Sequence, residues 1–349
     1  MASGSQFSSI DEYGFMRSKS FDLSGQEEFM KSYLRILSSR AQKWDKIVKR
    51  GYDQMERGIR LKRYIRKGIP SSHRRGAWME ISGAGKMKKE EPDLFSTMLN
   101  LPTNRVVLDQ IVTDMPRTFP NNINFDSTNP NSMQKPLLNI LTAFANSNPS
   151  IGYCQGLNYI AGLLLLATRD QDSSFWLLKV LVEKILPDYY SPSMPGLTTD
   201  FKVLAEISRK DIPLLARHID GLQMPWALIC SKWFICLYAE VLPTETVLRV
   251  WDCLFAEGSK VLFRVALTIL KIHEKEFLEK RDFADLIEEF KRFLKSQEVL
   301  NCHSLLEKVY QNPTSLTRSK LAKLRVEYGN QTRVEQLERD KRRREINNS

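Results

Sequence analysis

Residues 157–166 read Leu-Asn-Tyr-Ile-Ala-Gly-Leu-Leu-Leu-Leu. Apolar side chains occupy nearly every position, so a helix formed here would be apolar on all of its sides. Such a helix is stable in water only when other elements surround it. The stretch therefore predicts a helix at the centre of a protein core. The longest uninterrupted apolar run, residues 159–167, falls well short of the roughly 20 residues that span a bilayer.

The stretches around this core segment carry apolar residues at intervals of three and four, which is the period of an amphipathic helix. Proline, glycine and asparagine separate them. We find no run of alternating apolar and polar residues and no internal repeat, so the sequence predicts an all-α, multi-helix fold. The helices are expected within residues 26–48, 59–65, 74–81, 137–144, 157–166, 175–186, 201–207, 226–237, 247–255, 262–272 and 287–294.

Composition and pattern divide the chain into five expected regions. The first is polar and Ser-rich and is expected to be disordered or loosely ordered. A helical basic flank, a main domain, a helical part packed on that domain, and a charged tail that is helical or disordered follow. In order, the regions are 1–25, 26–66, 67–275, 276–317 and 318–349.

Positive charge is concentrated in two segments that flank the centre of the chain. The net charge is +11, and residues 31–75 carry 15 Lys+Arg against 3 Asp+Glu. Residues 318–345 carry 10 against 5. Such segments are suited to an anionic membrane surface or to nucleic acid. The alternative, which we favour, is that they form solvated helix faces.

Features of a secreted or membrane-anchored protein are not found. The N-terminus has neither the basic nor the apolar part of a signal peptide, and neither end carries a lipidation motif. The five cysteines are scattered without paired spacing, which is typical of reduced, buried thiols in the cytosol. We therefore expect a cytoplasmic protein.

Arg117 ends the motif Ile111-x-x-Asp114-x-x-Arg117. Pro116 cannot continue a helix and biases Met115 towards an extended conformation, so the helix that carries Asp114 is expected to end there. Arg117 would then project from an irregular segment. Asp114, three residues earlier, is placed to hold the guanidinium group by a charge-assisted hydrogen bond. Taken alone, however, Arg117 would be an ordinary surface residue.

Gln155 belongs to the motif Tyr153-x-Gln155-Gly156 and is expected to open the apolar helix. A glutamine at that place is able to orient a water molecule through its carbonyl oxygen and to donate its NH₂ group to a phosphate. The alternative is that Gln155 caps its own helix or satisfies a neighbouring backbone group. We expect Tyr153 to be a packing residue whose ring sets the angle of the loop.

Arg74 and Trp78 follow the Gly68-Ile69-Pro70 break and lie four positions apart, so they share one face of a helix. Packing or cation–π stacking accounts for both without any chemistry. We expect them to be mainly structural, with a place at the edge of a partner surface as the alternative. Asp252 is expected to make a buried hydrogen bond.

No pattern indicates a nucleotide or a metal held by this chain. Residues 83–86, Gly-Ala-Gly-Lys, lack the spacing and the Ser or Thr of a phosphate-binding P-loop. The four histidines and five cysteines have no metal-ligand spacing. We therefore expect neither a cofactor nor a metal site.

In combination, the motifs resemble the fingerprint of the TBC domain, the helical module that activates Rab-type small GTPases. Each motif is weak singly, but their order and spacing together are specific. The likeness continues through residues 231–234, 242–243, 250–252 and 257–258, and it covers about residues 60–275. The resemblance identifies the expected main domain, residues 67–275, as a TBC domain.

The resemblance implies a GTPase-activating protein that acts in trans on a GTP-bound Rab and has no enzymatic activity of its own. GTP and Mg²⁺ would belong to the Rab partner, and the setting would be vesicle trafficking on the cytosolic face of a membrane. Arg117 would be the arginine finger, and Gln155 a glutamine finger that replaces the catalytic glutamine of the GTPase. The implied supporting residues are Asp114, Tyr153, Gly156, Arg74 and Trp78.

Two other functions stay open at this point. A non-catalytic Rab effector or scaffold would bind the GTP form without accelerating hydrolysis. A binder of nucleic acid or membrane through the basic flanks would lose affinity steeply with salt. The acidic balance of the centre disfavours nucleic acid, so we expect at most peripheral membrane contact, through the Rab or the flanks. The sequence defines neither the particular Rab nor the oligomeric state.

Overall fold

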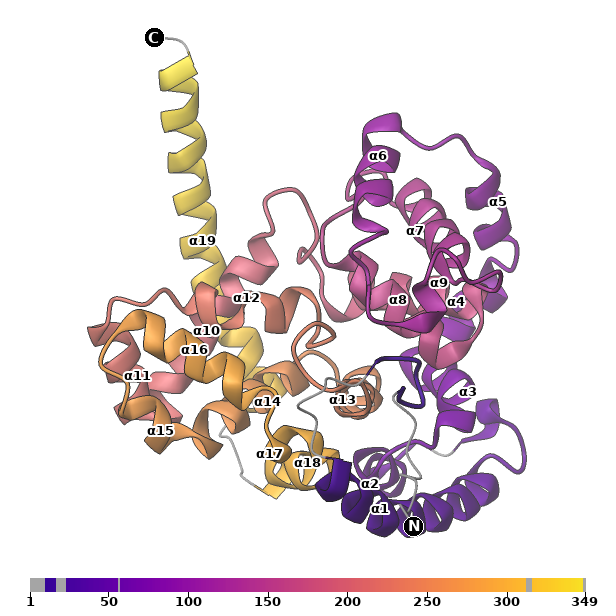
Figure 1. The fold of residues 1–349 in the computed structure, drawn as a ribbon. Coiled ribbons are helices and arrows are strands. Elements are labelled where there is room, and N and C mark those ends of the chain that lie inside the picture. The colour runs from indigo at the N-terminus through magenta and orange to yellow at the C-terminus, as the bar shows by residue number, and fades with distance from the viewer. Residues whose placement is uncertain (1–9, 17–22, 56, 312–315, 348–349) are drawn as a thin grey trace. The chain divides into compact units, whose positions relative to one another are not determined.

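The computed structural model of the protein describes residues 10–16, 23–55, 57–311 and 316–347. Within these ranges all regular elements are helices, and extended backbone pairs only at two isolated bridges, Ile10–Met16 and Phe15–Asn122 (Figure 1). The all-α prediction is confirmed. The chain divides into two compact units, Met1–Leu181 with Trp251–Ala256 (unit 1), and Val182–Val250 with Glu257–Ser349 (unit 2).

Unit 1 is built around the apolar helix, which the structure places at Leu157–Thr168 (α8). Side chains on all sides of α8 are buried, as its composition predicts. Helices α3 (Ser71–Ser82), α7 (Gln134–Ser147) and α9 (Gln171–Val180) pack against it. The other helices of unit 1 are α1 (Leu23–Ile47), η1 (Tyr52–Gln54), α2 (Ile59–Lys67), α4 (Ala84–Glu90), α5 (Leu94–Asn100), α6 (Arg105–Asp114) and η2 (Ile123–Phe125).

A buried carboxylate joins separate parts of unit 1. Asp252 accepts hydrogen bonds from the Trp78 indole Nε1 at 2.8 Å and from the Ile69 backbone N–H at 3.0 Å. It also pairs with Arg74 at 3.4 Å. The expected buried hydrogen bond of Asp252 is thereby confirmed. Because a buried charge is costly unless it is paired and hydrogen-bonded, this cluster fixes the start of α3 against residues 251–256.

Residues 10–16 lie in the region 1–25, which was expected to be disordered or loosely ordered, and the structure describes them. These residues form a closed turn in which Asp11 Oδ1 accepts hydrogen bonds from the N–H groups of Tyr13 (2.9 Å) and Phe15 (2.8 Å). Tyr13 is buried and holds the turn against the rest of unit 1. Helix α1 begins at Leu23. Residues 1–9 and 17–22, on which the rest of that expectation falls, lie outside the described residues.

Unit 2 is a second helical assembly, in which α10 (Pro195–Asp211) packs against α11, α12, α14 and α19. The charged tail forms α19 (Arg318–Asn347), and Arg325 anchors it by two bonds, 2.8 and 2.6 Å, to the buried carboxylate of Asp200. The other elements are η3 (Leu181–Ile185), α11 (Pro213–Gly221), α12 (Trp226–Ile235), α13 (Thr244–Glu257), α14 (Lys260–Ile272), α15 (Glu274–Leu278), α16 (Phe283–Phe293), α17 (Gln297–Leu300) and α18 (Cys302–Gln311). Of these, the first residue of η3 and residues 251–256 of α13 belong to unit 1.

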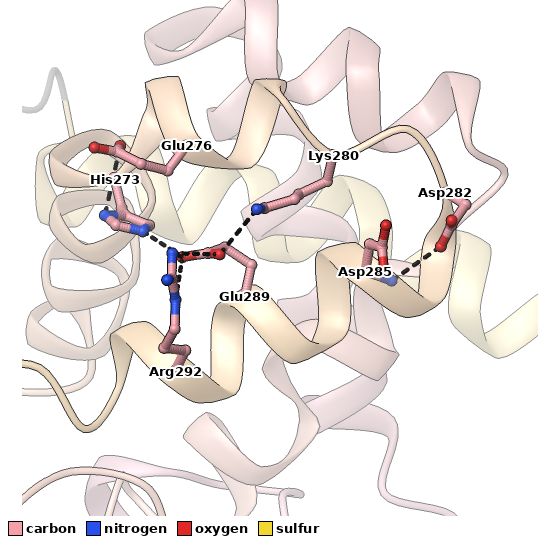
Figure 2. A network of polar contacts seen from close by, with 7 residues as sticks. All are labelled: His273, Glu276, Lys280, Asp282, Asp285, Glu289 and Arg292. Atoms are coloured by element: carbon pink, nitrogen blue, oxygen red, sulfur yellow. Dashed lines mark hydrogen bonds and ion pairs between the residues drawn. The ribbon is translucent and has the colours of Figure 1, made fainter.

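A polar network joins α16 of unit 2 to the end of α14 and to α15 (Figure 2). The buried carboxylate of Glu289 contacts His273 Nε2 at 2.6 Å, Lys280 Nζ at 3.1 Å and Arg292 at 2.7 Å. Burial by itself would raise the pKa of Glu289, but the hydrogen bonds from Arg292, His273 and Lys280 outweigh it and lower the pKa to about 2. Glu289 is therefore ionised in the folded protein at neutral pH.

The five cysteines are all buried and none forms a disulfide bond, as their spacing predicts. No helix of the described residues is long and apolar enough to cross a bilayer. Many basic residues of the N-terminal flank lie on the exposed side of α2: Leu61 and Ile65 face the core, while Arg60, Lys62 and Arg63 are exposed.

Candidate functional site

Arg117 lies just beyond the C-terminus of α6. Asn104 caps the N-terminus of this helix by accepting from Val106 N–H at 2.9 Å. The helix ends at Asp114, as Pro116 predicts. Met115, however, is not extended as expected: it has φ −56° and ψ −51° and its N–H bonds to the carbonyl of Ile111. Burial of the Met115 side chain and this hydrogen bond outweigh the bias imposed by the following proline.

The buried carboxylate of Asp114 connects Arg117 to Tyr153. Its Oδ1 pairs with a terminal nitrogen of Arg117, and its Oδ2 accepts a hydrogen bond from the Tyr153 hydroxyl at 2.5 Å. Burial, and then the hydrogen bond to Asp114, raise the pKa of Tyr153 well above its ordinary value. The phenol therefore stays protonated and acts as the donor. Both carboxylate oxygens of Asp114 are thereby engaged.

Arg117 itself remains available to solvent. Its side chain is 50% exposed although it is paired with Asp114. The ion pair uses one terminal nitrogen, and a guanidinium group has five N–H donors. Asp114 therefore limits the orientations of the side chain, and the half-exposed guanidinium group keeps donors that this ion pair does not use.

Gln155 lies in the turn before α8, not within the helix, which begins two residues later at Leu157. Its side chain is exposed, and within the described residues its amide makes no hydrogen bond. The alternative that Gln155 caps its own helix is therefore not what the structure shows. Gly156 makes this turn with φ 109°, a backbone conformation that favours glycine. The turn presents the Gln155 amide to solvent.

Asn158 and Thr118 join the two segments inside the core, and sequence reasoning missed both. Asn158 is fully buried; its Oδ1 accepts from Gly156 N–H at 3.1 Å, and its Nδ2 donates to Thr118 Oγ1 at 2.7 Å. Thr118 Oγ1 in turn donates to the Asp114 carbonyl at 2.8 Å. The sequence does contain a signal for Asn158, because its amide lies in an otherwise apolar helix. A buried amide requires hydrogen-bond partners.

Tyr159 and Phe119 add further contacts between the same segments. The Tyr159 hydroxyl donates to the Arg117 carbonyl at 3.3 Å, and its ring lies 5.4 Å from that of Phe119. Phe119 approaches α8 at Gly162, where a Cβ atom would lie 3.0 Å from the Phe119 ring. The turn with Gln155 and the segment with Arg117 are thus held together by polar and apolar contacts.

Arg74 and Trp78 are positioned differently from the residues above. Both side chains are buried, Arg74 being 2% exposed, and both bind Asp252. Their burial favours the structural interpretation over a place at the edge of a partner surface. Of the expected site residues, the structure brings together Asp114, Arg117, Tyr153, Gln155 and Gly156, and it places Arg74 and Trp78 in the framework.

The thiol of Cys154, which lies between Tyr153 and Gln155, is not activated as a nucleophile. Burial, together with the nearby charge of Asp114, raises the pKa of the Cys154 thiol to about 11, so it is protonated at neutral pH. Among the described residues, no group of three or more His, Cys, Asp or Glu side chains is arranged to hold a metal ion.

Comparison with protein families assigns the chain to a class. The model of the Rab-GTPase-TBC domain family matches residues 71–278. The chain belongs to this family, in agreement with the resemblance of its motifs.

Particular relatives are similar over nearly the whole chain. The growth hormone-regulated TBC protein 1 of Xenopus laevis is 45% identical over 317 residues, which cover 90% of this chain and 92% of that protein. The human protein of the same name is 45% identical over 316 residues, which cover 90% and 94%. Within the family, the sequence of residues 11–15, 186–192 and 254–260 indicates a likeness to this protein, and the comparison confirms that likeness.

Solved structures share the fold. The crystal structure of the Chlamydomonas flagellar RabGAP TBC domain has a TM-score of 0.75 and 30% identity, and the match covers 87% of this chain and 99% of that one. The YPT/RAB-GAP domain of GYP1P has a TM-score of 0.65 and 22% identity over 79% of this chain and 98% of that one. The second likeness is one of fold alone.

Proposed function

We propose that this protein is a GTPase-activating protein for a Rab-family small GTPase, to which it supplies Arg117 and Gln155 in trans. Membership of the Rab-GTPase-TBC domain family supports a Rab as the partner. One observation carries the assignment of residues: two exposed side chains with unused donors lie on two segments that a buried hydrogen-bond network joins. Exposure allows them to reach another protein, and the network limits their movement.

Arg117 would act on the charge that develops on the phosphates of the bound GTP. As the bond to the γ-phosphate breaks, negative charge spreads over the oxygens around it, and a guanidinium group neutralises that charge. An arginine supplied in trans accelerates hydrolysis by ~10³–10⁵, which corresponds to about 4–7 kcal/mol of the barrier. Asp114 would keep one nitrogen of Arg117 occupied and so direct the remaining donors towards the partner.

Gln155 would position the attacking water. The carbonyl oxygen of its amide accepts a hydrogen bond from that water, and its NH₂ group donates to the γ-phosphate. In this role Gln155 replaces the glutamine of the GTPase itself. GTP and Mg²⁺ are then held by the Rab, and this chain needs no nucleotide, metal or catalytic activity of its own.

The supporting residues contribute by positioning. An effective catalytic group has to be held near its productive geometry before the partner arrives, because ordering it during the reaction would add to the barrier. Tyr153 and Asp114 restrict the guanidinium group, and the Gly156 turn restricts the amide. The site would act at the cytosolic face of a membrane that carries the GTP-bound Rab.

Single-turnover GTP hydrolysis across a panel of purified Rab proteins tests this proposal. The protein should accelerate at least one Rab, while Arg117→Ala, Arg117→Lys and Gln155→Ala should each lower the maximal acceleration by at least ~10²-fold. Lysine should not substitute, because it lacks the planar fork of donors. Both positions are exposed, so the three variants should melt like the wild-type protein.

Binding measurements separate this proposal from its main alternative. Tight binding of a GTP-form Rab with no acceleration would make the protein an effector or scaffold. Full activity of either Ala variant would disprove the assigned role of that residue.

A further inference from the structure

Residues 10–16, which precede the segment matched by the family, contact the loop that follows Arg117. The Met16 N–H donates to the Asn121 carbonyl at 2.8 Å, and the Ile123 N–H donates to the Gly14 carbonyl at 2.9 Å. These two bonds make a short antiparallel pairing between the N-terminal segment and residues 121–123, with a bridge at Phe15–Asn122. The two segments are more than a hundred positions apart in sequence.

Side chains reinforce the pairing from both sides. The amide groups of Asn122 and Asn124 donate to the Tyr13 carbonyl at 3.0 and 2.9 Å. The Phe15 ring meets the Phe119 ring edge-on, with centroids 5.2 Å apart. Phe119 lies two residues from Arg117 and has φ 51°, a conformation that is strained for a bulky residue and persists only where its surroundings hold it.

The segment is itself closed and fits only with glycine at position 14. Its ends meet through the Asp11 N–H, which donates to the Phe15 carbonyl at 2.9 Å. Gly14 has φ 93°, and a Cβ atom there would lie 2.2 Å from Asn124 Nδ2 and 2.8 Å from Asn122 Oδ1. Any larger residue would push the segment away from the loop.

Tyr13 connects the segment to the framework of unit 1. Its buried hydroxyl accepts a hydrogen bond from Arg74 Nη1 at 2.9 Å, and Arg74 pairs with Asp252. The loop after Arg117 is therefore held through residues 10–16 to the same buried carboxylate that fixes the start of α3. A mobile tail would make none of these contacts.

We propose that residues 10–16, here called the N-terminal brace, position the Arg117 segment for catalysis. The inference rests on the proposed function and extends it to a segment outside the TBC match. The brace does not reach the partner; it holds Phe119 and residues 121–123, and through them the direction in which Arg117 leaves the chain. Loss of the brace should therefore lower the rate of the catalytic step and leave Rab binding nearly intact. A displacement of about 1 Å at a catalytic group costs up to ~10²-fold in rate.

Gly14→Ala in the full-length protein tests the brace, with Gly58→Ala as its matched control. Both substitutions add one methyl group to a glycine outside the family match, but a Cβ at position 58 would meet nothing within 4 Å. The rate of GTP hydrolysis is measured against increasing concentrations of the protein. Gly14→Ala should lower the maximal rate ~10–100-fold and change the half-saturating concentration by less than about threefold, less than ~0.7 kcal/mol of binding. Gly58→Ala should behave as wild type.

Hydrogen exchange supplies a readout that does not depend on activity. In Gly14→Ala, the amides of Met16 and Ile123 should exchange faster, while those of α8 should keep their protection. Tyr13→Phe, which removes only the hydroxyl bonded to Arg74, should give a smaller change of the same kind.

The outcomes distinguish the brace from the proposed function. Unchanged exchange at residues 119–124 in Gly14→Ala, or a wild-type maximal rate, would overturn the brace. A loss that appears only as weaker Rab binding would also overturn it, since that would make residues 10–16 part of the partner surface. If the wild-type protein accelerates no Rab, the proposed function fails, and the exchange data alone then decide whether the segment braces the loop.

Discussion

Replacing Asn158 by alanine is expected to damage both the stability of unit 1 and the proposed activity. The substitution removes two buried hydrogen bonds, one from Gly156 N–H at 3.1 Å and one to Thr118 Oγ1 at 2.7 Å. Thr118 keeps its hydrogen bond to the Asp114 carbonyl. The main group left without a hydrogen-bond partner is therefore the buried N–H of Gly156. The bonds contribute roughly 1 kcal/mol each, and an unsatisfied buried donor costs about 1–3 kcal/mol. The expected loss is therefore about 3–5 kcal/mol.

The assay has two parts. Urea denaturation followed by tryptophan fluorescence should report the loss of stability. Single-turnover GTP hydrolysis, measured where the variant is fully folded, should show the maximal acceleration reduced by ~10–100-fold, because the turn that carries Gln155 loses its internal restraint. Combined with Gln155→Ala, the change should cost far less than the product of the two single effects, since both act through one amide.

Thr118→Val serves as the matched substitution, because valine keeps the shape and removes the hydroxyl group. A double-mutant cycle between positions 118 and 158 should give a coupling energy of about 1 kcal/mol. The reasoning would be refuted by an Asn158→Ala protein whose stability lies within about 0.5 kcal/mol of wild type, the range of an ordinary surface substitution. Full acceleration by that variant would refute the positioning role.

Two further predictions concern the buried carboxylates. The pKa of Glu289, about 2, lies below its ordinary value of 4.5, so its stabilising contribution is present above about pH 4.5 and is lost as the pH falls towards 2. Thermal melts from neutral pH down to about pH 2 should show Glu289→Gln less stable than wild type at neutral pH and less sensitive to acid. Asp252→Asn removes the charge that pairs with the buried Arg74. Chemical denaturation should show unit 1 destabilised by about 3–5 kcal/mol. A loss below ~1 kcal/mol would contradict this expectation, because Arg74 would then have an adequate substitute partner.

The fold was predictable because its signal is local, whereas the catalytic roles of Arg117 and Gln155 follow from the resemblance of the combined motifs to the TBC domain and stay predictions. The composition of residues 157–166 predicts a buried helix whatever surrounds it, and α8 is that helix. Pro116 sets the end of α6 near Asp114, so spacing alone places Arg117 beside that carboxylate. Helix α18 lies in residues 276–317, which were expected to be helical, but its bounds were not predicted because the apolar stripe of Cys302, Leu305, Leu306 and Val309 is short.

The parts of the site that the sequence did not predict depend on contacts between residues that are distant in the chain. Residues 10–16 lie in a polar, Ser-rich region that suggests disorder, yet Tyr13 bonds to Asn122 across 109 positions. Asn158 was predictable only as a polar residue that needs partners, since Thr118 lies 40 positions away. Arg74 and Trp78 were recognisable as structural residues, but their shared partner Asp252 lies 178 and 174 positions away. Periodicity does not reveal such pairings.

A Rab whose own catalytic glutamine is replaced by alanine provides the most direct test of the central claim. If Gln155 supplies the catalytic amide in trans, the wild-type protein should accelerate GTP hydrolysis by this Rab nearly as well as by the intact one, and Gln155→Ala should accelerate neither. Acceleration of the intact Rab alone would contradict the claim, because the amide would then come from the GTPase and Gln155 would have no catalytic role.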